Sequence, residues 1–69
     1  MNMTKANIVK VLQAMADNDY SVYLSFKDDD EVMAEKMLAS SSALNSAVRL
    51  MTNKRYFENI AKIFFPEEE

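Results

Sequence analysis

The chain has no glycine and only one proline, Pro66, among its 69 residues. Glycine is the residue that adopts a positive φ most readily, and proline is the residue that interrupts a helix most strongly. Tight turns would therefore have to use Asn or Asp, and long helices are favoured by default. The chain also contains no Cys and no His. We therefore expect neither disulfides nor a structural zinc site.

The length indicates one small domain, which we expect to cover residues 1–69. A chain of this size buries only about 60% of the surface that it exposes when unfolded, so its stability is marginal. Small domains usually add disulfides, a metal or oligomerisation. Without Cys and His, oligomerisation is the support that remains open. Residues 66–69 form an acidic segment, which we expect to be a solvated tail.

The distribution of apolar residues does not indicate a membrane protein. Apolar residues make up 49% of the chain, but no apolar run approaches the roughly 20 residues that a membrane span needs. The opening MNMTKANIVKVLQAMADND has no long apolar core and no small-residue cleavage site, so we do not expect a secretory signal. We expect a cytoplasmic protein with no membrane contact.

Helical spacing of apolar residues predicts a helix over residues 4–17. Thr4 is the expected N-cap, and Asn18 within Asp17-Asn18-Asp19 is the expected left-handed C-cap. Asp28 with Glu31 three residues later has the spacing of a capping box, which predicts the start of a second helix.

After residue 31, the sequence predicts helices separated by two breaks. Ser40-Ser41-Ser42 predicts a break or kink, because serine competes for main-chain hydrogen bonds. Thr52-Asn53 is a second expected break, and Pro66 is the expected end of the last helix. Phe57, Ile60 and Phe64 then line one helical face, with Tyr56 and Ile63 alongside.

The stretch YSVYLSFK, residues 20–27, has a sequence period of two. Large apolar or aromatic residues occupy the even positions, and Ser21, Tyr23 and Ser25 occupy the odd ones between them. Such alternation is typical of a half-buried strand. The even positions, which would form the strand's pairing segment, are Tyr20, Val22, Leu24 and Phe26. No second alternating run exists, so we expect this strand to pair with its own copy across a two-fold axis. The expected fold class is α+β and mainly helical, ordered helix–strand–helix–helix, in a homodimer.

Acidic residues are concentrated in the middle of the chain, although the net charge is only −3. Seven acids fall within residues 17–35, and we expect them to form a surface for a basic or nucleic-acid-binding protein. The residues assigned to this surface are Asp17, Asp19, Tyr23, Asp28, Asp29 and Asp30. The alternative is that these acids only keep the protein in solution.

Three other patterns have both a functional and a structural interpretation. Arg49, Lys54, Arg55 and Tyr56 could form a nucleic-acid patch, but the sequence pI of about 4.8 argues for an ordinary mixed-charge surface. The acids at 28–31 could bind Mg²⁺ or Ca²⁺, but we expect solvated carboxylates at a helix start, without metal or cofactor. The methionines are expected to fill the core, with Met33 and Met37 as candidates for an adaptable binding groove.

From residue 20 onward, the expected order of strand, helix, serine-rich break and helix resembles the ribbon-helix-helix repressors. The segment SSALNSAVRLM resembles the start of that family's second helix. The resemblance implies an antiparallel ribbon in the DNA major groove, with Ser21, Tyr23 and Ser25 at the base-reading positions.

The sequence therefore predicts a small acidic binding protein rather than an enzyme. Without His, Cys and Gly, the commonest general base, the strongest nucleophile and the phosphate-binding loop are missing. The expected role is that of an inhibitor, adaptor or regulator of another protein, of the kind found among phage and mobile-element accessory proteins. The alternative is a ribbon-helix-helix transcriptional regulator that binds DNA.

Overall fold

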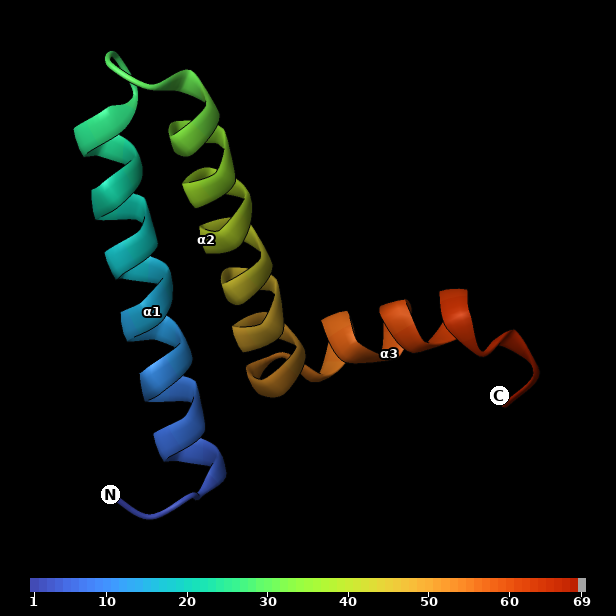
Figure 1. Ribbon diagram of the computed structural model, residues 1–69. Helices are drawn as coiled ribbons and strands as arrows, with labels where there is room; N and C mark the ends of the chain where they lie inside the picture. The colour runs from blue at the N-terminus through green and yellow to red at the C-terminus, as the bar shows by residue number, and fades with distance from the viewer. Residues whose placement is uncertain (69) are drawn as a thin grey trace.

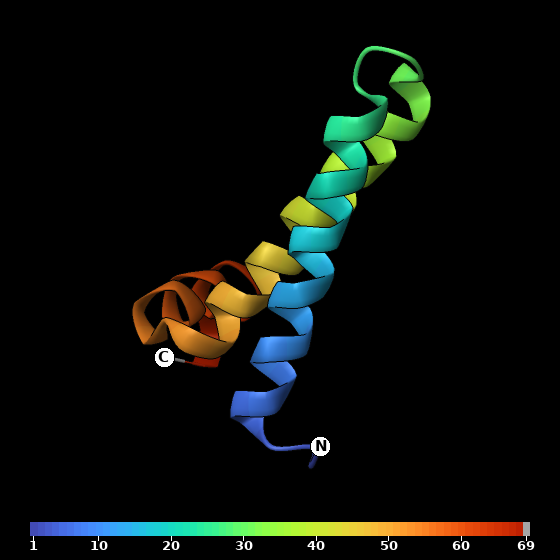
Figure 2. The same ribbon diagram turned by 90° about the vertical axis from the view of Figure 1, so that its left-hand side faces the viewer.

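The computed structural model describes residues 1–68 and consists of three α-helices and a short 3₁₀ turn. The elements are α1 Lys5–Phe26, α2 Glu31–Thr52, α3 Lys54–Phe64 and η1 Pro66–Glu68. Helices α1 and α2 form an antiparallel hairpin, and α3 leaves the end of α2 and points away from α1 (Figure 1). The turned view in Figure 2 shows that no other helix covers the broad faces of the hairpin.

The predicted α+β fold is wrong, because the described residues 1–68 are all-α and contain no strand. Segment 20–26 forms the last turns of α1. Val22 and Phe26 are four residues apart, and so are Tyr20 and Leu24, so each pair lies on one side of a helix. The alternation therefore reflects a helix with apolar residues on two sides. Without a strand in this segment, the predicted ribbon between two copies does not form.

The ribbon-helix-helix resemblance fails for the same reason. Its base-reading positions lie on a helix, where the Ser25 hydroxyl donates a hydrogen bond to the Ser21 main-chain carbonyl at 3.1 Å. There is no strand within residues 1–68 that could enter a DNA groove.

Helix α1 passes through the predicted stop at residues 17–19 without a change of conformation. No residue between 1 and 68 has a positive φ, so Asn18 does not form a left-handed cap. The flanking carboxylates bond to side chains instead. Gln13 Nε2 donates to Asp17 Oδ1 at 3.2 Å, and the Ser40 hydroxyl of α2 donates to Asp19 Oδ2.

The predicted break at residues 40–42 is also wrong, because α2 is continuous through the three serines. Ser41 is buried and its hydroxyl donates to the carbonyl oxygen of Ala16 at 2.9 Å. Ala16, Ala34 and Ser41 are the buried residues of the described chain. Because the distance between helix axes depends on the side chains at the contact, these small residues allow α1 and α2 to pack closely.

The helix boundaries confirm part of the prediction. The Thr4 hydroxyl accepts a hydrogen bond from the Asn7 amide at 3.2 Å, as an N-cap does. The break at Thr52-Asn53 is confirmed, since α2 ends at Thr52. The cap of α2 is Asp30 rather than Asp28, and its carboxylate accepts from the Met33 amide at 3.0 Å.

The last helix ends as predicted before Pro66. Helix α3 stops at Phe64, and Phe65 has φ −134° and ψ 62°. Such a departure from helical geometry is expected for a residue that precedes proline. Residues 66–68 of the predicted solvated tail form η1, and Glu69 lies outside the described residues.

The chain is extended for its length. The radius of gyration of the Cα atoms is 15.0 Å, whereas a compact domain of this length has a value of about 11 Å. The reason is visible in Figure 1, where α3 projects from the hairpin and does not pack across it. Among the described residues, no large side chain is fully buried.

Candidate functional surface

The hairpin has two different broad faces, one on each side of the seam where α1 meets α2. Gln13 lies three residues before the buried Ala16 in α1, and Asn45 lies four residues after the buried Ser41 in α2. Their side-chain amides meet at 3.4 Å, with Gln13 Nε2 donating to Asn45 Oδ1. These two positions thus lie on one face, which is polar here. Ser40, one position before the buried Ser41, lies on the opposite face of the antiparallel pair, where it bonds to Asp19.

Apart from Asn18 and the Ser40–Asp19 pair, that opposite face is apolar, and we call its apolar residues the methionine face. Its residues in α1 follow spacings of three, four and seven, and those in α2 follow spacings of four and seven, which keeps each set on one stripe. The members are Ile8, Val11, Met15 and Val22 from α1 and Met33, Met37, Leu44 and Met51 from α2. Val11 and Met15 are 47% and 49% exposed. The hairpin alone therefore leaves this face incompletely covered.

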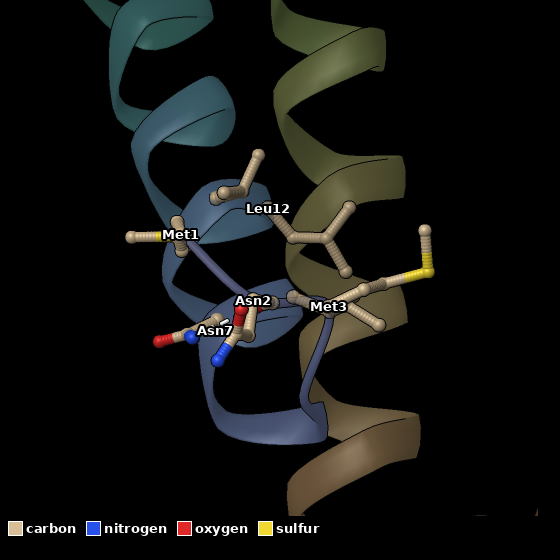
Figure 3. A pocket seen from close by; sticks show the side chains of 7 residues that line it. Met1, Asn2, Met3, Asn7 and Leu12 are labelled. Atoms are coloured by element: carbon tan, nitrogen blue, oxygen red, sulfur yellow. Dashed lines mark hydrogen bonds between the residues drawn. The ribbon is translucent and has the colours of Figure 1, made fainter.

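A small pocket lies at the N-terminal end of the methionine face (Figure 3). Its volume is about 320 Å³, and its walls include Met1, Met3 and Leu12. The first residues turn back along α1, and Asn7 Nδ2 donates to the Asn2 carbonyl at 2.8 Å. Met1 and Met3 are among the most exposed apolar residues, so the side of the pocket that they form is open to solvent.

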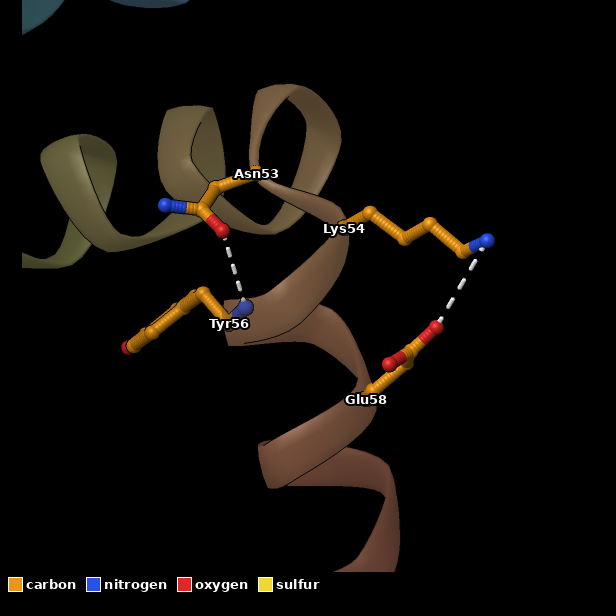
Figure 4. A network of polar contacts seen from close by, with 4 residues as sticks. All are labelled: Asn53, Lys54, Tyr56 and Glu58. Carbon is orange, nitrogen blue, oxygen red and sulfur yellow. Dashed lines mark hydrogen bonds and ion pairs between the residues drawn. The ribbon is translucent and has the colours of Figure 1, made fainter.

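The corner between α2 and α3 gathers the residues of the predicted basic patch. Asn53 Oδ1 accepts from the Tyr56 amide at 3.0 Å and so caps α3 (Figure 4). The Arg49 guanidinium lies 4.3 Å from the centre of the Tyr56 ring, a cation–π contact. Lys54 forms an exposed ion pair with Glu58 at 3.8 Å. Arg55 follows Lys54 in the first turn of α3. The Arg49–Tyr56 contact thus joins the last turn of α2 to the first turn of α3.

Helix α3 separates apolar and polar residues on two sides. With about 100° between successive residues, the apolar side chains occupy one half of the circumference and the polar ones the other half. The apolar half consists of Tyr56, Phe57, Ile60, Ala61, Ile63 and Phe64. Phe57 is 55% exposed, and Ile63 and Phe64 are each 70% exposed. These three of the six residues therefore mainly meet solvent, whereas Tyr56, Ile60 and Ala61 are half-buried.

The residues of the predicted acidic surface are spread over the hairpin and its turn. Asp19 is half-buried and bonded to Ser40, and Asp30 caps α2. Asp17 accepts from Gln13, and Tyr23 is half-buried, with its ring tilted by 38° against that of Tyr20 and 5.6 Å between ring centres. Asp28 and Asp29 lie in the exposed turn between α1 and α2.

The predicted pairing residues divide between the faces. Val22 belongs to the methionine face and Phe26 lies near it, whereas Tyr20 and Leu24 lie toward the other side of α1.

The sequence did contain a signal that α2 is continuous. Met33, Met37, Leu44 and Met51 have helical spacing across the serines, which is possible on one face only if the helix does not break.

Within residues 1–68, no group of acidic side chains is arranged as a metal site. None of the helices in this part of the chain combines the length and the apolar character that a membrane-spanning segment needs. Comparison of the chain with protein-family models, with curated proteins and with solved structures finds no match. The fold and its exposed surfaces define an all-α hairpin that carries a projecting amphipathic helix.

Proposed function

We propose that this is a non-catalytic binding protein that acts on another protein, and that α3 is the element it inserts into its target. The observation that carries the proposal is the apolar face of α3, on which Phe57, Ile63 and Phe64 are more than half exposed. Contiguous apolar surface of this kind is typical of interaction sites.

The spacing of the side chains fits recognition of a helix by a groove. In that mode, residues at positions i, i+3, i+4 and i+7 enter the groove as anchors. Phe57, Ile60, Ala61 and Phe64 have this spacing. Aromatic anchors are frequent among the residues that dominate binding energy. The Asn53 cap and the Arg49–Tyr56 contact hold the base of α3, so less freedom is lost on binding.

The charges around the apolar face indicate what kind of groove would fit. The other half of α3 carries Lys54, Arg55 and Lys62 against a single acid, Glu58. A groove with acidic residues at its rim would therefore complement α3. The acidic surface for a basic target remains a separate prediction, in which Asp28 and Asp29 are the members placed in the exposed turn.

The proposal is tested by photo-cross-linking from α3. A photoreactive phenylalanine analogue replaces Phe64 in one sample and Asn59, on the polar half, in the other. The proteins that cross-link in an extract of the producing cells are identified, purified and titrated with the wild type, with Phe57→Ala/Phe64→Ala and with Asn59→Ala. We expect cross-links from position 64 only, and at least about a tenfold loss of affinity in the Phe double variant.

Two results would contradict the proposal. One is a purified partner that binds Phe57→Ala/Phe64→Ala as tightly as the wild type. The other is α3-dependent binding to vesicles of anionic lipid without a protein partner, because a short basic amphipathic helix can also bind a membrane surface.

A further inference from the structure

We propose that the methionine face binds the same face of a second copy, so that two hairpins form a four-helix bundle. The first argument is the surface that one chain leaves exposed. Its accessible surface is 5602 Å², whereas a compact monomer of 7.9 kDa exposes about 4,400 Å². The excess is about 1,200 Å² and is shared between the hairpin and the projecting α3, whereas a standard interface buries roughly 800 Å² on each partner.

The second argument is the chemistry of the face. The eight side chains of the methionine face are aliphatic or thioether groups without charge. Beside them on the same side of the hairpin lie Asn18 and one carboxylate, that of Asp19, to which the Ser40 hydroxyl donates a hydrogen bond. A face with so little charge can meet its own copy with little repulsion, whereas a strongly charged patch would repel itself. Four of the eight are methionines, whose flexible side chains can fill gaps between two packed surfaces.

The third argument is the architecture of the fold. Stable domains pack at least two layers around a core, but the hairpin is one layer and α3 turns away from it (Figures 1 and 2). A two-fold dimer is the commonest symmetric assembly. It supplies the second layer without any further component. Two antiparallel hairpins brought together in this way have the helix arrangement of a four-helix bundle.

The polar contacts between the helices divide between the two faces. Gln13, Asp17 and Asn45 make their hydrogen bonds on the opposite side, which remains in water, whereas the Ser40–Asp19 bond lies on the side of the methionine face.

The two surfaces meet at the corner between α2 and α3, where Met51 and Phe57 line one pocket. Phe64, near the far end of α3, does not line that pocket, so variants at Phe64 separate the target contact from the dimer.

The test is sedimentation equilibrium of the full chain at tens of micromolar, with circular dichroism as the check of folding. We expect the wild type to have twice the mass of one 7.9 kDa chain. Met15→Glu/Met37→Glu should remain helical and dissociate at least about tenfold more readily. Phe64→Glu, on α3, should dimerise as the wild type does. A monomeric wild type, or a double variant that dimerises unchanged, would overturn the proposal.

A second measurement decides the matter if the double variant does not fold. Because the chain has no native Cys, single cysteines can be compared with a short bismaleimide cross-linker. Met15→Cys should give a cross-linked dimer in high yield, and Ser42→Cys, on an exposed position of α2 away from the face, should not. Equal yields would contradict the proposed interface. Dissociation by Phe64→Glu would also do so, by showing that copies join through α3.

Discussion

The hydroxyl of Ser41 in α2 donates a hydrogen bond to the main-chain carbonyl oxygen of Ala16 in α1, over a distance of 2.9 Å. Both residues are buried. At this point the side chains between the two long helices are small. Ala16 contributes a methyl group and Ser41 a hydroxymethyl group. A larger side chain at this point would have to push the helices apart.

We therefore expect Ser41→Leu to lower the free energy of unfolding by about 1–3 kcal/mol, because it overpacks the seam. The matched control is Ser42→Leu, whose side chain is exposed and whose effect should be within about 0.5 kcal/mol. Urea denaturation followed by circular dichroism, at one fixed protein concentration, measures both. Equal effects of the two substitutions would show that Ser41 does not lie between the helices.

The N-cap of α2 gives a second prediction. Asp30→Ala removes the carboxylate that accepts the Met33 amide and should lower the free energy of unfolding by about 1 kcal/mol. Asp28→Ala, two residues earlier in the turn, should change it by less than about 0.5 kcal/mol. Thermal or urea unfolding compares the pair. A larger effect at Asp28 would restore the capping-box prediction made from the sequence.

The base of α3 gives a third prediction. Asn53→Ala removes the cap of a helix of 11 residues, and isolated helices of this length are marginal in water. Amide hydrogens of α3 should exchange at least about fivefold faster, in line with a cap worth about 1 kcal/mol, while those of α1 and α2 keep their rates. Asn59→Ala is the control on the same helix. If it accelerates exchange equally, the cap is not what holds α3.

Asn18 gives a fourth prediction, which rests on the proposed dimer. It is exposed and lies between Met15 and Val22 on the α1 stripe, where a single polar residue weakens association but fixes its register. Asn18→Leu should tighten the dimer at least about fivefold, since it adds apolar area to the interface. Ser21→Leu, on the outer side of α1, should not. Sedimentation at a series of dilutions compares them, and equal dissociation constants would exclude Asn18 from the interface.

The sequence predicted the caps and ends of several helices, because these depend on local chemistry. Thr4, the Thr52-Asn53 break and the stop before Pro66 each involve only neighbours along the chain. The apolar face of α3 was predicted for the same reason, since five of its members were already recognised by spacing.

The continuity of the two long helices was not predicted, because it depends on contacts between residues far apart in the sequence. Ser40 and Ser41 were read as helix breakers, yet their hydroxyls bond to Asp19 and Ala16 of the other helix. The alternation at 20–26 was read as a strand because α1 carries apolar residues on two sides. One side lies on the methionine face, and the other side lies toward the polar face.

The most direct test of the methionine face is an isotope-filtered NMR experiment on a mixed dimer. One half of the sample carries ¹³C-methyl methionine and the other half is unlabelled, so that contacts between copies can be separated from contacts within one. We predict intermolecular NOEs from the Met15 and Met37 methyl groups to side chains of the methionine face in the other copy. Sharp methionine signals without any intermolecular NOE, or NOEs only to the aromatic rings of α3, would contradict it.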